Sequence, residues 1–324
     1  MFCAIIFAAK YFTKNDRFMK KLYMLFPVLA GVCWGTAGIF VRGLQAAGLS
    51  NLTIIFGRLT MTVVMLGLWM FITDKSLFKI KKKDIPVVAV TGIIGFSLMN
   101  IFYNYSIQYL SLSLAAVLLC TAPVYVIIFG AVFFKEKITP MKIACMIAVL
   151  FGCLLMTGIV ESGHLQWSLL GILIGVACSL SNAVCTLGCN EASGVRGMHP
   201  VTLLFYNTLF ALVPLVFFAD YGEIGGFVAA DPLKGIGLFT LNALITSLLP
   251  NLFFNISFVH LESGVVSILA SGAEPTAALI FGLLIFSEIP TLIGFIGMVI
   301  VVGSIIILTN SKQKDKKLKA GGEA

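Results

Sequence analysis

The sequence predicts an all-α integral membrane protein with ten transmembrane helices, arranged as two inverted repeats of five helices. Three observations support this prediction: the composition, the length of the apolar runs and a set of polar motifs that occurs twice. Of the 324 residues, 59% are hydrophobic and 11% are charged, and the mean hydropathy is +1.04. Soluble domains carry roughly 25% charged residues, so a soluble chain of this length could not cover its surface.

Long apolar runs divide the chain into helices. A run of about 20 residues spans the ~30 Å hydrocarbon core of a bilayer, and a backbone in lipid must satisfy its own hydrogen bonds, so each run is predicted to be helical. The expected helices cover residues 22–45, 51–73, 85–109, 111–134, 140–159, 167–190, 199–219, 234–259, 262–287 and 289–309. The longest polar connection is 220–231. Residues 1–18 place a short apolar stretch before basic residues, the reverse of a signal peptide, and translation is expected to start naturally at Met19.

The basic residues indicate the orientation in the membrane. All Lys and Arg except Arg42, Arg58 and Lys234 lie in or next to the segments before the first helix, after an even-numbered helix or behind the last one. A basic excess marks the cytoplasmic side, so we expect a multi-pass protein of the cell membrane with both termini in the cytoplasm. The expected parts are a cytoplasmic N-terminal segment (1–21), two five-helix repeats (22–159 and 167–309) and a basic cytoplasmic tail (310–324). Because the charge of +8 follows this topology, nucleic acid is not expected as a partner.

Two sets of motifs carry the repeat. Asn100-Ile-Phe-Tyr-Asn104-Tyr-Ser recurs as Asn251-Leu-Phe-Phe-Asn255-Ile-Ser, and Pro123, Glu136 and Thr139 recur as Pro275, Glu288 and Thr291. A repeat with an odd number of helices must be inverted in its second copy. Inverted repeats are typical of secondary transporters, whose solute site lies near the membrane midplane between the halves.

Two ionisable residues fall inside predicted spans. Glu274 lies about halfway along its helix, and Arg58 lies about two turns into another. Charges inside a membrane are costly and line a cavity or form a pair by default. Glu274 is therefore either a site for a substrate amine or a proton, or a structural carboxylate. Arg58 either contacts a carboxylate or other anion, or is a structural arginine that snorkels to the interface.

Further polar and aromatic residues accompany these charges. Asn100 and Asn104 share one helix face, and Asn251 and Asn255 repeat it. The candidates nearby are Trp34, Tyr103 and Asn207, of which Asn207 aligns with Arg58. Such a stripe faces protein or water rather than acyl chains. It would either line a cavity for a polar solute or join helices by hydrogen bonds.

Two prolines are predicted to break helices at corresponding positions. Pro123 and Pro275 each free a backbone carbonyl one turn earlier. Interrupted helices in both halves indicate a transport site, whereas the alternative is a kink that serves packing alone.

The chain lacks the patterns of common enzyme and metal sites. None of the eight cysteines forms a Cys-x-x-Cys pair, and no Walker, HExxH or GxSxG sequence occurs. We therefore expect no enzymatic activity, no catalytic residues, no metal and no cofactor.

The motifs resemble a known family. Gly31-Val-Cys-Trp34-Gly, Ala122-Pro123-Val with Phe134-Lys-Glu136-Lys, and the counterpart Glu274-Pro275 with Phe286-Ser-Glu288 are similar to those of the drug/metabolite transporter superfamily, EamA type. The resemblance implies a ten-helix exporter or exchanger of amino acids, their derivatives and other polar compounds, working by proton coupling or facilitated diffusion. It also implies structural roles for Glu136 and Glu288.

The leading hypothesis is thus a secondary transporter that exports amino acids or similar small polar metabolites by alternating access. Its partners would be a small-molecule solute, the lipid bilayer and protons as the coupling ion, and a homodimer is a further hypothesis. The alternatives are a non-transporting membrane receptor or scaffold, and a transporter of nucleosides, sugars or drugs.

Overall fold

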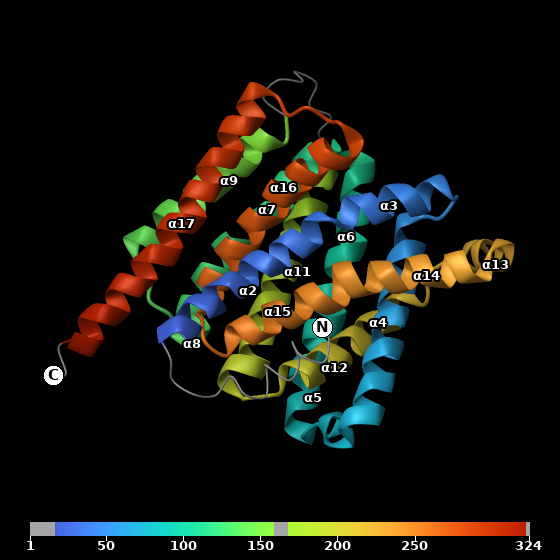
Figure 1. The fold of residues 1–324 in the computed structure, drawn as a ribbon, viewed down its shortest axis with the longest axis horizontal. Helices are drawn as coiled ribbons and strands as arrows, with labels where there is room; N and C mark the ends of the chain where they lie inside the picture. Colours follow the sequence, from blue (N-terminus) through green and yellow to red (C-terminus); the bar gives the residue numbers. More distant parts are fainter. Residues whose placement is uncertain (1–16, 159–167, 322–324) are drawn as a thin grey trace.

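The computed structural model describes residues 17–158 and 168–321, and within them the chain is helical and without strands (Figure 1). Eight helical segments of the described chain are long and apolar enough to cross a membrane. Two shorter apolar helices, α9 (Pro140–Met156) and α12 (Pro200–Leu215), accompany them. This architecture fits the predicted integral membrane protein. Residues 1–16 of the expected N-terminal segment lie outside the described residues, and the expected start of translation at Met19 stays a prediction.

The first half of the chain contains the helices up to α9. They are α2 (Arg17–Gly35), α3 (Ala37–Ala46), α4 (Asn51–Thr73), the short η1 (Lys75–Phe78) and η2 (Lys82–Asp84), α5 (Ile85–Val90), η3 (Thr91–Ser97), α6 (Leu98–Tyr109), α7 (Leu112–Cys120), α8 (Ala122–Phe134) and α9. Helix α4 has the predicted bounds. The first predicted helix is instead interrupted at Thr36, whose hydroxyl donates to the Cys33 carbonyl at 2.7 Å.

The second half contains α11 (Leu169–Cys189), η4 (Asn190–Val195), α12, α13 (Tyr221–Ala230), α14 (Pro232–Ala243), η5 (Leu244–Leu248), α15 (Leu249–Phe258), α16 (Ser263–Phe286) and α17 (Leu292–Gly321). The polar connection 220–231 forms α13, because the Asp220 carboxylate accepts from the N–H groups of Gly222 and Glu223. Helix α17 continues past residue 309 into the basic tail.

The two matching prolines behave differently. The helix of the first half is interrupted at Thr121, so that α7 ends and α8 begins just before Pro123. Helix α16 runs through Pro275 without interruption. The predicted break at Pro275 is therefore absent. A proline removes one hydrogen bond of the helix, and packing of the flanking turns keeps the rest of α16 helical.

A π-helical turn precedes the asparagine motif in each half. η3 leads into α6 and η5 into α15. In both halves the asparagine side chain donates to a carbonyl of this turn: Asn100 Nδ2 donates to the Phe96 carbonyl and Asn251 Nδ2 to the Ser247 carbonyl, each at 2.7 Å.

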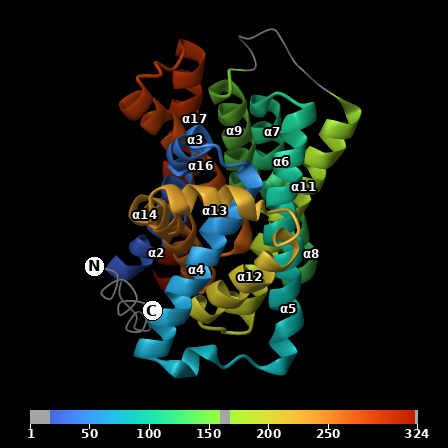
Figure 2. The same ribbon diagram turned by 90° about the vertical axis from the view of Figure 1, so that its right-hand side faces the viewer.

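The helices of the two halves pack against one another. Helix α2 lies along α15 and α16, and α9 lies along α17 (Figures 1 and 2). Glycines allow the close approach at both contacts. A Cβ atom at Gly35 would lie 2.7 Å from the Glu274 carbonyl oxygen, and one at Gly297 would lie 2.6 Å from the Gly152 carbonyl oxygen. The site described next therefore lies between helices that come from both halves.

Candidate functional site

A cluster of polar side chains gathers where helices of both halves meet. Glu274 of α16 interacts electrostatically with Arg58 of α4 and with Tyr103 of α6. Cys120 of α7 and Cys178 of α11 lie close enough to Tyr103 to interact with it as well. The cluster thus draws on five helices, and its two charges have opposite signs.

The two charges attract each other but do not form an ion pair. Both side chains are half-buried, and no direct ion pair joins them among the described residues. In the low dielectric of a protein interior, the attraction between two opposite charges that do not touch is stronger than it would be in water. Arg58 and Glu274 therefore contribute two charges of opposite sign to this cluster, and no ion pair is formed between them.

Helix α2 sets the position of Glu274. A Cβ atom at Gly31 would lie 2.7 Å from the Cβ atom of Ala273, so the backbones of α2 and α16 approach closely beside the carboxylate. Trp34, one turn from Gly31 on α2, packs edge-on against Phe254 with ring centroids 5.2 Å apart. Trp34 therefore supports the contact between α2 and α15.

Arg58 reaches the π-helical turn of the second half. Its Nη1 donates to the Thr246 hydroxyl at 3.4 Å, and that hydroxyl lies 2.7 Å from Asn242 Oδ1. Three buried polar atoms in this group lack a hydrogen-bond partner: Arg58 Nε, Asn242 Nδ2 and Ser247 Oγ. Buried polar atoms are normally satisfied. The unused donors around Arg58 could therefore bind a carboxylate.

The predicted asparagines divide into separate groups. The amide nitrogens of Asn100 and Asn251 are bound to their own helices, as described above. Asn255 is buried, and its Nδ2 donates to the Pro200 carbonyl at 3.5 Å, joining α15 to the start of α12. Asn207 is buried beside Cys189 with its Oδ1 unpartnered, and Asn104 is half-buried on α6. Among these asparagines, Asn255 and Asn207 contact another helix, and a role of the stripe in lining a cavity stays a prediction.

Sequence reasoning missed Asn242 and Thr246. The two polar residues are four positions apart in an apolar helix, which is the same spacing that drew attention to Asn251 and Asn255. This pattern could have revealed them. Their contact with Arg58 depends on the packing of α4 against α14 and η5.

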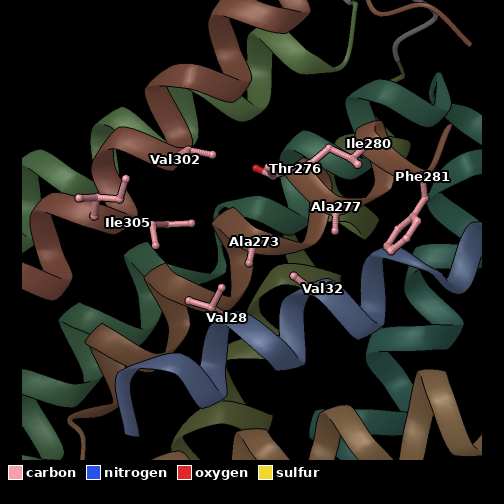
Figure 3. A pocket seen from close by; sticks show the side chains of 10 residues that line it. Val28, Val32, Ala273, Thr276, Ala277, Ile280, Phe281, Val302 and Ile305 are labelled. Carbon is pink, nitrogen blue, oxygen red and sulfur yellow. The ribbon is translucent and has the colours of Figure 1, made fainter. Parts of the chain in front are cut away.

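A cavity of about 280 Å³ lies elsewhere, between α2, α16 and α17 (Figure 3). Its lining is apolar except for Thr276, whose hydroxyl already donates to the Gly272 carbonyl at 2.8 Å. Val28 and Val32 face it from α2. A polar solute would find no free partner there, so this cavity is not the candidate site.

Comparison with known proteins identifies the family. The sequence model of the EamA-like transporter family matches residues 21–158 and again residues 169–310. The chain belongs to the EamA-like transporter family. This membership confirms the resemblance drawn from the sequence motifs, and with it a multi-pass membrane transporter.

Relatives of this EamA-like chain are named as transporters. An uncharacterized transporter, YdfC of Bacillus subtilis, is 26% identical over 69% of this chain and 71% of its own length. The pseudopaline exporter CntI of Pseudomonas aeruginosa is 26% identical over 91% of this chain and 98% of its own length. A probable terminal-alkyne amino-acid exporter of Streptantibioticus cattleyicolor is 27% identical over 44% of this chain and 46% of its own length.

The fold of this EamA-like chain also has a counterpart among solved structures. One crystal structure of a protein superposes with a TM-score of 0.71 over 90% of this chain and 98% of its own, at 14% identity. At this identity the likeness shows a shared fold.

Proposed function

We propose that the chain is a secondary transporter that exports amino acids or similar small polar metabolites across the cell membrane by alternating access. The observation that carries this proposal is the opposition of Glu274 and Arg58, on helices from different halves, without a direct ion pair. In this proposal Glu274 binds the ammonium group of the solute and Arg58 binds its carboxylate.

The cost of these charges supports a role in transport. A charged side chain at the centre of a span costs about 2.5–3.5 kcal/mol on insertion scales. Arg58 also keeps a buried Nε without a partner, beside the unused donor of Asn242. A carboxylate of the solute would satisfy both donors.

The proposed topology consists of ten spans in two inverted sets of five, with both termini in the cytoplasm. The double match to the EamA-like family and the repeated motifs support the two sets. The placement of the basic residues supports the orientation. Alternating access then corresponds to a rocking of one half against the other around the site.

The names of the relatives support export and the solute class. One is a pseudopaline exporter and another a probable terminal-alkyne amino-acid exporter. A solute with an amine and a carboxylate agrees with the chemistry of Glu274 and Arg58. We further propose that Glu274 exchanges a proton during the cycle.

The test is solute flux in proteoliposomes that contain the purified full-length chain. The panel contains amino acids, their derivatives, nucleosides, sugars and drugs. We expect saturable flux of an amino acid or derivative. Glu274→Gln and Arg58→Gln should each lower it roughly 30-fold or more, because losing one partner of a buried charged contact costs about 2 kcal/mol or more.

The matched control is Thr240→Val. Thr240 is half-buried on α14, and its hydroxyl donates to the Ile236 carbonyl of its own helix, so this variant should keep the original flux. Flux of nucleosides, sugars or drugs alone would contradict the solute class. Full pH-dependent transport by Glu274→Gln would contradict the proton role.

A further inference from the structure

The helices α8 and α16 end in the same backbone turn. Lys135 and Ser287 both adopt left-handed conformations, with φ of 54° and 56°. The N–H groups of the following residues, Glu136 and Glu288, each donate to a carbonyl of the preceding helix at 3.2 Å. Each half thus builds the same cap and places a glutamate at corresponding points.

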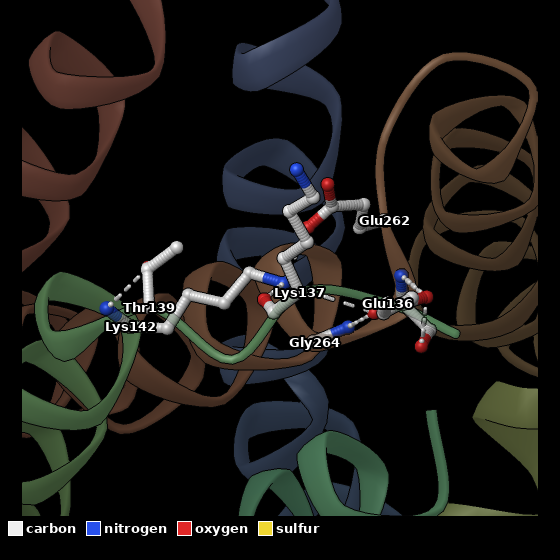
Figure 4. A network of polar contacts seen from close by, with 7 residues as sticks. Glu136, Lys137, Thr139, Lys142, Glu262 and Gly264 are labelled. Atoms are coloured by element: carbon white, nitrogen blue, oxygen red, sulfur yellow. Dashed lines mark hydrogen bonds and ion pairs between the residues drawn. The ribbon is translucent and has the colours of Figure 1, made fainter. Parts of the chain in front are cut away.

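Glu136 links the end of α8 to the start of α16 by hydrogen bonds. Its carboxylate accepts from the N–H group of Ser263 at 2.7 Å, from the Ser263 hydroxyl at 2.6 Å and from the Gly264 N–H group at 3.3 Å (Figure 4). Lys142 Nζ lies 3.9 Å from Glu136 Oε2 and also forms an ion pair with Glu262. The Glu136 side chain is 9% exposed. Glu136 is thus the charged cap of the first turn of α16.

Glu288 has a different partner. Its carboxylate binds the Arg42 guanidinium at 2.6 Å, and the two side chains are 54% and 53% exposed. The same guanidinium lies 4.5 Å over the Phe286 ring. An exposed ion pair of this kind is weakly held, so Glu288 can be released without a large cost.

The counterpart of Ser263 is Ser111. Each serine stands twelve positions before the matching proline, Pro275 or Pro123. Ser111 caps α7, and its hydroxyl accepts from the Leu114 N–H group at 3.3 Å. Among the described residues, the hydrogen bonds of the Glu288 carboxylate go to Arg42 and not to α7. A carboxylate therefore caps the first turn of α16, whereas the first turn of α7 is capped by the Ser111 hydroxyl and not by Glu288.

We propose that Glu136 and Glu288 are alternating caps, which lock opposite ends of the molecule in the two states of the transport cycle. The first turn of any helix presents unpaired N–H groups and a partial positive charge, which a carboxylate stabilises. In the structure described here Glu136 caps α16. In the other state Glu288 leaves Arg42 and caps α7 at Ser111, while Glu136 leaves Ser263.

A rocking of α16 as one rigid helix would make the two caps exclusive. Helix α16 has 24 residues and is therefore about 36 Å long. It carries the capped turn at Ser263 and the capping Glu288 at opposite ends. A rocking of α16 that brings its C-terminal end to α7 moves its N-terminal end away from α8. The inference rests on the proposed alternating access, but not on the identity of the solute.

Disulfide trapping in the purified full-length chain tests this proposal. Ser263→Cys with Glu136→Cys should form a disulfide, since these positions touch in the structure. Ser111→Cys with Glu288→Cys should form one only if the second state exists. In the chain with all four substitutions, mass spectrometry should find one disulfide or the other in a molecule, and not both. The unsubstituted chain controls for the native cysteines.

A second measurement probes the coupling between the ends. In the Ser111→Cys/Glu288→Cys chain, Glu136→Ala removes the competing cap and should raise the rate of disulfide formation about tenfold. The matched control is Glu223→Ala. It removes a carboxylate that accepts from the Ser50 N–H group and that takes no part in the two proposed caps. It should leave the rate unchanged.

Two results would overturn the alternating caps. One is the absence of the Ser111–Glu288 disulfide under conditions in which the other pair reacts fully. The other is an unchanged rate in the Glu136→Ala chain. Neither readout needs a solute, so alternating disulfides without amino-acid flux would refute the proposed function alone. Flux without alternating disulfides would refute the caps alone.

Discussion

Single side chains at the ends of helices tie separate segments of this chain together. Glu223 in the first turn of α13 accepts from the Ser50 N–H group at 2.8 Å, and Ser50 in turn caps α4. This backbone hydrogen bond lowers the pKa of the Glu223 carboxyl below its usual range. The bond thus links α13 to the start of α4, and its strength depends on the ionisation of one exposed carboxylate.

The link between Glu223 and Ser50 should weaken in acid. Because the pKa of Glu223 is lower in the folded chain, its contribution to stability is full above the ordinary glutamate pKa of ~4.3 and is lost as the pH falls through the lower folded pKa. Hydrogen exchange of the peptide around Ser50 should be faster in Glu223→Gln than in the original chain at about pH 6. The two rates should converge at low pH. An equal difference at both pH values would contradict this assignment, and the amides of α11 provide the internal control.

At the scale of the elements, the contact between α2 and α16 depends on missing side chains. Gly31 and Gly35 bring α2 against the α16 backbone on both sides of Glu274. Small residues allow such approach in membrane helices, where packing rather than the hydrophobic effect drives association. The small-residue motif of α2 therefore positions the proposed amine subsite.

Filling this contact should separate the helices. Gly35→Val would place side-chain atoms where the Glu274 carbonyl and Ala277 already lie, and overpacking of this kind costs about 1–3 kcal/mol. We expect a lower melting temperature in detergent and lower flux. Gly38→Val is the matched control, since nothing lies within 4 Å of an added Cβ atom there. Equal melting temperatures for the two variants would contradict the packing argument.

At the scale of the whole molecule, the two halves are interleaved rather than juxtaposed. Helix α2 of the first half lies against α15 and α16, and α9 lies against α17 of the second. The candidate site likewise takes Arg58 from one half and Glu274 from the other. Each half alone would leave these contact faces exposed.

Separately expressed halves should need each other. If the chain is divided between residues 159 and 167, each fragment alone should aggregate in detergent, because its partner's contact faces are missing. The two fragments expressed together should co-purify as a one-to-one complex with the original flux. A folded, monodisperse first fragment on its own would contradict this expectation.

Local properties of the sequence determined the helices and their polar faces. A backbone in lipid must bond to itself, so apolar runs such as 51–73 predict helices with accurate bounds. Capping of the polar stretch 220–231 could have been recognised at Asp220. The repeated motifs and the two intramembrane charges were likewise visible in the letters, and their roles in transport stay predictions.

The tertiary structure alone decided which of these residues meet. Hydropathy and helical spacing concern neighbours along the chain, whereas the approach of Arg58 to Glu274 depends on the packing of helices from both halves. The same applies to Glu136 and Glu288. Their local turns are alike, yet one carboxylate caps α16 and the other binds Arg42, because the two ends of the molecule are packed differently.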